Sequence, residues 1–341
     1  MPGRIELFSF FFQAPTAWVL GALAAGQLLA ALGRLRGTTL VAPTVWALAA
    51  VGMLVVSATF GPRDTPADHY LGYATAIFLL APGLAVLGAK RPQSGAWQFI
   101  VATFVGMLML PVFNGLAAGL AAPQPHALLR WLNVIVFLVG AFNYLPTVQF
   151  FPIMTTWLGV AMLLGVCFPG NFGRTAAADA LALLCLNIGL AVAWVFARRR
   201  RRVPRGMQRL WSDFRDAYGT VWGVRVAERL NVAARRHGWP VTFAWRGIRV
   251  AEPNDAENPP DALPMELFKS SAAPWNEPPA ELTDGLRRLD PDLRRRIRRE
   301  FHTLLRRFVS PEWIAERDDS EAYTFPRHRG VSTAGEHTEG R

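Results

Sequence analysis

Two histidines stand where metal or haem chemistry is possible. His69 and His126 fall at the outer ends of two long apolar stretches, and Asp64 and Asp68 lie next to the first of them. Histidine is the commonest metal ligand, so two imidazoles on one face could bind haem or a transition metal. The two are 57 residues apart and share no surrounding motif. We therefore favour a simpler interpretation, in which both are polar residues at a membrane surface.

Recognised catalytic and cofactor motifs are missing from the sequence. It contains no phosphate-binding glycine loop, dinucleotide fingerprint, zinc-protease motif, serine-hydrolase elbow or kinase motif set. The triplet at 290–292 has the D-x-D pattern of sugar-nucleotide transferases, but a helix start explains it, with Asp290 as N-cap and Pro291 in the first turn. We predict no catalytic residue and no cofactor, and a non-enzymatic protein is favoured.

Amides are the polar side chains that fall deep inside the apolar half of the chain. Asn114, Asn133 and Asn143 could line a polar cavity for a neutral or lipidic solute. Asn114 has the best case, because the nearby Pro111 leaves a backbone carbonyl without its helical donor. Amides also pair between membrane helices, and small residues such as Gly115 let helices pack closely. Packing is the favoured interpretation, and a channel or transporter is the alternative.

Arginine clusters indicate anion binding. Each basic residue near an anionic membrane surface contributes about 1 kcal/mol, so we expect contact with anionic lipids of the inner leaflet, or with an acidic protein partner. Nucleic acid is a disfavoured partner because no recognition motif accompanies the charge. The residues expected to contact the inner leaflet are Arg198, Arg199, Arg200, Arg201, Arg202, Arg295, Arg298 and Arg299.

The composition predicts a polytopic membrane protein for the first half. Hydrophobic residues make up 52% and charged residues 18% of the 341 residues, too apolar a balance for a soluble protein unless the charges are segregated. No carboxylate occurs between Asp68 and Asp179, which argues against a proton-coupled transporter. Apolar stretches long enough for a membrane helix give seven expected spans, at about 16–33, 40–59, 70–88, 97–122, 127–145, 150–167 and 176–197.

Loop charges predict the orientation of these spans. Nine arginines and lysines fall on one side, including the run at 198–202, and three on the other. Because basic loops are retained in the cytoplasm, the N-terminus is expected outside the cell membrane and the C-terminus inside.

The second half is expected to be small, basic and mostly helical. Residues 198–250 predict a basic juxtamembrane helix and a possible β-hairpin. Gly219 and Gly223 weaken the middle of this helix. Residues 251–280 read as a proline-rich acidic linker, and 281–317 as arginine-rich amphipathic helices.

Two arrangements of the amphipathic helix after Asp290 remain open. Its apolar stripe could lie on the membrane surface, or it could pack against the helix that begins at Met207. Residues 318–341 are expected to form a disordered tail.

The chain as a whole is expected to be a multi-pass membrane protein for binding, scaffolding or signalling, with a basic cytoplasmic platform. The alternatives are the channel or transporter, and a membrane enzyme or haem or metal protein that uses His69 and His126.

Overall fold

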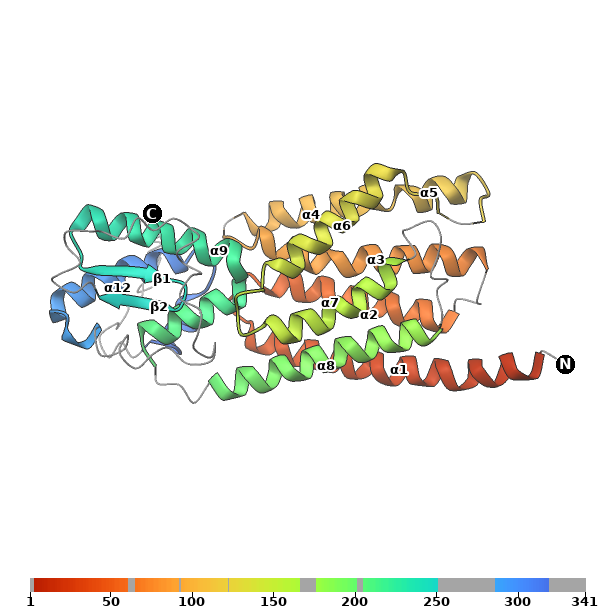
Figure 1. Ribbon diagram of the computed structural model, residues 1–341, viewed down its shortest axis with the longest axis horizontal. Helices are drawn as coiled ribbons and strands as arrows, with labels where there is room; N and C mark the ends of the chain where they lie inside the picture. Colours follow the sequence, from red (N-terminus) through yellow and green to blue (C-terminus); the bar gives the residue numbers. More distant parts are fainter. Residues whose placement is uncertain are drawn as a thin grey trace, which may run out of the picture.

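The molecule is elongated and has two parts (Figure 1). Helices α1 to α8 lie side by side along its long axis and form the bundle, while residues 205–250 and 286–318 form a smaller lobe at one end. This computed structural model describes residues 3–60, 65–91, 93–121, 123–165, 176–200, 205–250 and 286–318. The predicted linker at 251–280 and the predicted tail beyond Asp318 lie outside the described residues.

The bundle contains helices apolar enough to cross a membrane. Its elements are α1 (Gly3–Arg34), α2 (Val41–Phe60), α3 (Pro66–Leu87), α4 (Ser94–Leu108), α5 (Leu110–Ala117), α6 (Ala127–Phe142), α7 (Phe150–Leu164) and α8 (Ala176–Arg200). By length and composition α1, α2, α3 and α8 each contain a candidate span, and α4 with α5, bent by 41°, make a fifth if they count as one. These apolar helices indicate a membrane-spanning protein.

Seven spans are therefore not confirmed among the described residues. Helices α6 and α7 are apolar but have 16 and 15 residues. They are about 24 and 22 Å long, whereas the hydrocarbon core is about 30 Å thick. Helix α6 ends earlier than predicted because the backbone turns at Asn143, which bonds to another helix, and α7 ends at Gly165.

The bend between α4 and α5 is satisfied by protein groups. Val112 N donates to Met109 O, so Leu108 O loses its usual helical donor. The hydroxyl of Tyr73 on α3 donates to Leu108 O instead, at 3.1 Å. One turn beyond the bend, Gly115 leaves the space that the ring of Tyr70 fills. These contacts support the packing interpretation of the fourth predicted span.

Trp157 holds α3, α6 and α7 together. Its ring is 8% exposed and packs edge-on against Phe137, with ring centroids 5.0 Å apart. It lies over Gly83 of α3 and Gly140 of α6, and a Cβ atom on Gly140 would overlap the indole. Gly140 is therefore needed for this close approach, while a Cβ atom on Gly83 would lie 3.2 Å from the same ring.

The lobe has its own aromatic core. Its elements are α9 (Met207–His237), β1 (Val241–Ala244), β2 (Gly247–Val250), α12 (Pro291–Leu305) and α13 (Pro311–Ala315). The predicted N-cap of α12 is confirmed, because Asp290 accepts from Leu293 N at 2.9 Å. Phe301 on the apolar stripe of α12 lies 6.2 Å from Trp211 and 5.5 Å from Phe243, between ring centroids. Of the two arrangements left open by the sequence, the structure has the stripe packed on α9 and the hairpin.

The predicted hairpin is present, and side-chain amides border both of its edges. Strands β1 and β2 pair antiparallel, with Ala244 opposite Gly247. On the outer edge of β1, Asn231 accepts from Phe243 N at 2.7 Å and donates to Phe243 O at 3.0 Å. On the outer edge of β2, Gln208 does the same for Ile248, at 2.9 and 2.7 Å. A lone two-stranded hairpin is marginal in water, so these amides of α9 help to hold it.

Replacing Gly140 by alanine tests the packing around Trp157. We expect Gly140→Ala to lower the stability of the bundle by about 1 to 3 kcal/mol, because the added methyl overpacks the indole. Gly106→Ala is the matched control, since nothing lies within 4 Å of a Cβ at that position. The control should be neutral or slightly stabilising, because alanine is the better helix former. Equal thermal unfolding midpoints for both variants in detergent would contradict this role of Gly140.

Candidate functional site at the junction of bundle and lobe

A backbone ladder joins the lobe to two loops of the bundle. Thr39 N donates to Phe308 O at 3.0 Å, and Ser310 N donates to Gly37 O at 2.6 Å. Thr38 and Val309 form an isolated antiparallel β-bridge between these bonds. From the neighbouring loop of the bundle, the Arg91 amide donates to the carbonyl of Arg307. The residues after α12 therefore pair with the bundle much as an extra strand would.

Tyr218 lies at the centre of this contact. Its side chain is fully buried, and its hydroxyl donates to Phe308 O at 2.8 Å. The same hydroxyl lies 3.1 Å from Oγ1 of Thr39, which donates to Ala89 O at 2.8 Å. Burial is the main cause that raises the pKa of Tyr218 to about 12. The phenol therefore stays neutral and keeps its donor at physiological pH.

Helix α9 turns a corner next to Tyr218. Gly219 has φ 76° and ψ −167°, a conformation that only glycine adopts readily, and it divides α9 into two arms. Figure 1 shows the corner pointing at the bundle and both arms running back into the lobe. A Cβ atom on Gly219 would overlap Asn143. The corner, residues 218–221, therefore needs glycine both for its dihedral angles and for its contact with the bundle.

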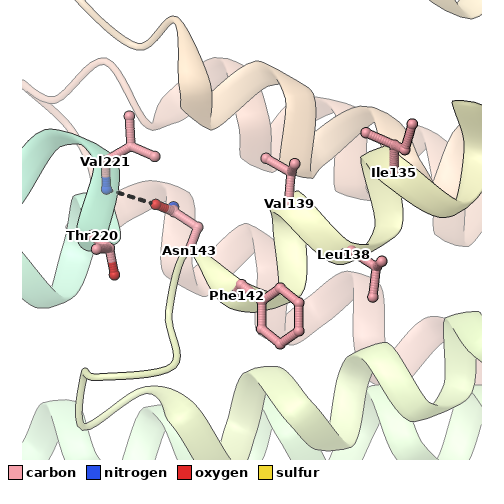
Figure 2. Close-up of a pocket in the computed structure, with 7 residues that line it drawn as sticks. All are labelled: Ile135, Leu138, Val139, Phe142, Asn143, Thr220 and Val221. Carbon is pink, nitrogen blue, oxygen red and sulfur yellow. Dashed lines mark hydrogen bonds between the residues drawn. The ribbon is translucent and has the colours of Figure 1, made fainter.

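Asn143 satisfies the backbone groups that this corner leaves without helical partners. Its side-chain oxygen accepts from Val221 N at 3.0 Å, and its backbone carbonyl accepts from Thr220 N at 2.6 Å. Its side-chain amide donates to Tyr218 O at 3.3 Å. The asparagine that ends α6 thus acts as the N-cap of the second arm of α9, across the junction. We call these three bonds the Asn143 clamp; Figure 2 shows the bond to Val221.

Aromatic donors join the end of α3 and the loop between α6 and α7 to α9 and the hairpin. The indole of Trp222 donates to Val86 O at 3.1 Å, and the hydroxyl of Tyr144 donates to Ala217 O at 3.2 Å. The indole of Trp245, in the hairpin turn, donates to Pro146 O at 2.6 Å. Because each of the three bundle loops on this side bonds to the lobe, the two parts meet through a specific, largely desolvated interface.

An open apolar groove lies beside the clamp. It has a volume of about 490 Å³ and is lined by Ile135, Leu138, Val139, Phe142, Asn143, Thr220 and Val221. Figure 2 shows the α6 side chains along one stripe, with the corner of α9 at its end. The lining is almost entirely apolar, so this groove suits a hydrocarbon group better than a polar solute.

The structure separates the three predicted intramembrane amides. Asn143 forms the clamp and contributes to the groove, and Asn133 is fully buried on α6. These two are ten residues apart on one helix, or about 15 Å. Asn114 is exposed on α5 and lies away from the groove lining. Two other amides do pair across a helix interface, since Gln27 of α1 donates to Asn187 of α8 at 3.0 Å.

The two histidines lie at the starts of α3 and α6. His126 is exposed, and its Nδ1 accepts from Leu128 N at 3.4 Å, so it caps the start of α6. His69 is half-buried in the first turn of α3, beside the buried Asp68. In the part of the chain that the structure describes, no group of three or more His, Cys, Asp or Glu side chains could hold a metal ion.

The predicted membrane-contact arginines fall into different environments. Arg198 and Arg199 are exposed near the end of α8, and the Arg198 guanidinium lies 3.3 Å from the ring centroid of Trp194. The backbone of Arg200 ends α8, while Arg201 and Arg202 lie outside the described residues.

The predicted membrane-contact arginines of α12 also differ in their environments. Arg295 and Arg299 are exposed. Arg298 instead lies 3.0 Å from the buried carboxylate of Asp318, which also bonds to His302 at 2.8 Å. Arg298 is thus bound inside the lobe, and Asp318, the first residue of the predicted tail, is buried there as well.

Sequence reasoning missed the residues that build the junction. Neither Thr39 nor Tyr218 belongs to a sequence motif. Their hydroxyls matter because they donate to backbone carbonyls of other segments. Gly219 was visible only as a weak point in a predicted helix. No family model, curated protein or solved structure matches the chain.

The clamp can be tested with matched asparagine variants. Asn143→Ala should destabilise the protein by about 1 to 2 kcal/mol, because it removes an N-cap and leaves a buried amide and carbonyl unsatisfied. It should also speed proteolysis of α9. Asn114→Ala, at an exposed position, should leave both unchanged. A wild-type unfolding midpoint and digestion pattern for Asn143→Ala would show that the clamp is dispensable.

Tyr218 predicts a loss of stability at alkaline pH. The pKa of tyrosine is about 10 in an unfolded chain, and that of folded Tyr218 is about 12. Its contribution is therefore fully present below the lower value and is lost as the pH rises through the higher one. Tyr218→Phe should be less stable than wild type at neutral pH, yet its unfolding midpoint should fall less steeply between these pH values. Parallel pH profiles would exclude Tyr218 as the titrating group.

Proposed function

We propose that this is a non-enzymatic seven-span protein of the plasma membrane, with its N-terminus outside, that presents the lobe in the cytoplasm as a basic binding platform. Helices α6 and α7 are apolar and lie within the bundle, which supports counting both as spans. A bilayer can thin locally around short helices at modest cost. The excess of basic residues in loops on the lobe side supports the orientation.

The arginine face of α12 is the observation that carries this proposal. Ile297, Phe301 and Leu305 are fully buried in the lobe, so the apolar side of the helix is already used. Outward from it point Arg295, Arg296 and Arg299, all exposed. We call these three the arginine face. Arg295 also pairs with the exposed Asp292, so the three arginines and this carboxylate together carry a net positive charge, which favours an anionic partner and speeds its association.

The position of α12 favours an acidic protein as that partner. The residues after its C-terminal end form the junction, and the helix extends from there into the lobe (Figure 1). Arg299 and Arg295 are therefore about 14 and 20 Å along the chain axis from Phe308. We propose that the arginine face meets a partner in the cytoplasm, whereas Arg198 and Arg199 meet anionic lipid at the end of α8.

Charge reversal on the arginine face tests the platform. The full-length chain in lipid nanodiscs is titrated with a fluorescent polyglutamate peptide at several salt concentrations. We expect salt-sensitive binding that Arg295→Glu/Arg299→Glu weakens about tenfold, since each exposed pair contributes up to about 1 kcal/mol. Arg235→Glu/Arg236→Glu is the matched control, because both residues are exposed at the far end of α9. Equal losses in the two double variants would mean that net charge, rather than this face, determines binding.

A further inference from the structure

The groove beside the Asn143 clamp continues the outer surface of α6. Ile135, Leu138, Val139 and Phe142 recur at helical spacing and are 54, 39, 39 and 57% exposed. In a bilayer such a stripe faces hydrocarbon. Unlike a plain lipid-facing surface, it is closed at its lobe end by Thr220 and Val221 of α9 (Figure 2). The groove is therefore built from two segments that the clamp holds together.

Its dimensions suit a single hydrocarbon chain. The stripe from Ile135 to Phe142 is about 10 Å long, within the half-thickness of a hydrocarbon core of about 30 Å. Over that length the groove has a volume of about 490 Å³ and is open along one side. An extended acyl chain can therefore lie in it from the surrounding hydrocarbon.

Two polar side chains of α9 lie in the groove wall or one helical turn beyond it. Arg225 is exposed one turn beyond Val221, and its guanidinium lies 5.3 Å from the ring centroid of Trp222. The hydroxyl of Thr220, in the groove wall, is buried with no hydrogen-bond partner among the described residues. A hydroxyl can donate to an ester carbonyl, and a guanidinium pairs with phosphate. The order from α6 to α9 thus matches acyl chain, ester and phosphate.

We propose that this groove is a binding site for one anionic phospholipid of the leaflet next to the lobe. One acyl chain lies along the α6 stripe, the ester accepts from Thr220, and the phosphate pairs with Arg225. Because the lipid contacts α6 and the second arm of α9 together, its binding stabilises the junction that the clamp forms. This site is separate from the arginine face and does not depend on the platform.

Native mass spectrometry tests the site. The full-length protein is reconstituted with equal parts phosphatidylglycerol and phosphatidylcholine, extracted in mild detergent, and its bound lipids are counted. Wild type should retain one phosphatidylglycerol per chain. Val139→Trp fills the groove and should abolish retention. Leu128→Trp, on the same helix at a position 71% exposed, should retain the lipid as wild type does.

A second variant, with its own control, tests recognition of the headgroup. Arg225→Gln should retain about five times less phosphatidylglycerol and lose the preference over phosphatidylcholine, by the loss of one interfacial charge. Arg236→Gln, near the end of α9, should keep both. Thr220→Val, which keeps the shape of the side chain, should also lower retention and covers the case in which Val139→Trp folds poorly. The proposal is overturned if Val139→Trp, Thr220→Val and Arg225→Gln all retain lipid like wild type. It is also overturned if the wild type forms a dimer without bound lipid and Val139→Trp abolishes that dimer.

Discussion

The Asn143 clamp is the contact on which the rest of the structure depends. A helix that turns through Gly219 exposes amides and carbonyls at its corner, and these groups need partners once water is excluded. Asn143 supplies them with one side chain and one carbonyl. Both arms of α9 start from this corner. The first arm carries Trp211 and Phe214, and the second carries Leu230 and Asn231, so the lobe's core and hairpin are assembled on a frame fixed by a bundle residue.

The sequence predicts features that depend on neighbouring residues, and it does not predict contacts between residues far apart in the chain. Local signals gave correct elements: Asp290 caps α12, and alternating residues form the hairpin. The C-terminal end of α6 was predicted too late because Asn143, near the predicted end of the span, bonds to α9, 75 or more residues away. No pattern near Asn143 specifies that partner. The same limit applies to Thr39 and Phe308, which meet through backbone atoms that every residue has.

Composition alone also fails to distinguish the arginines. Arg215 is buried, pairs with Asp216 at 2.9 Å and donates to Trp245 O at 2.6 Å. Arg298 pairs with Asp318 inside the lobe, while Arg295 and Arg299 of the same helix face solvent. A high arginine content thus serves both internal cohesion and surface charge. Only the fold shows which residues carry the external field that a partner or membrane would sense.

The amides that border the hairpin have a consequence for how copies of this protein can associate. Exposed strand edges offer unpaired backbone groups that recruit further strands, a common route to aggregation. Here Asn231 and Gln208 occupy the middle of the two outer edges, at Phe243 and Ile248. A strand from another molecule would have to displace an amide already bonded at both ends. The lobe can therefore be crowded at a membrane surface without joining its neighbours by sheet extension, and contacts between copies are left to its helices.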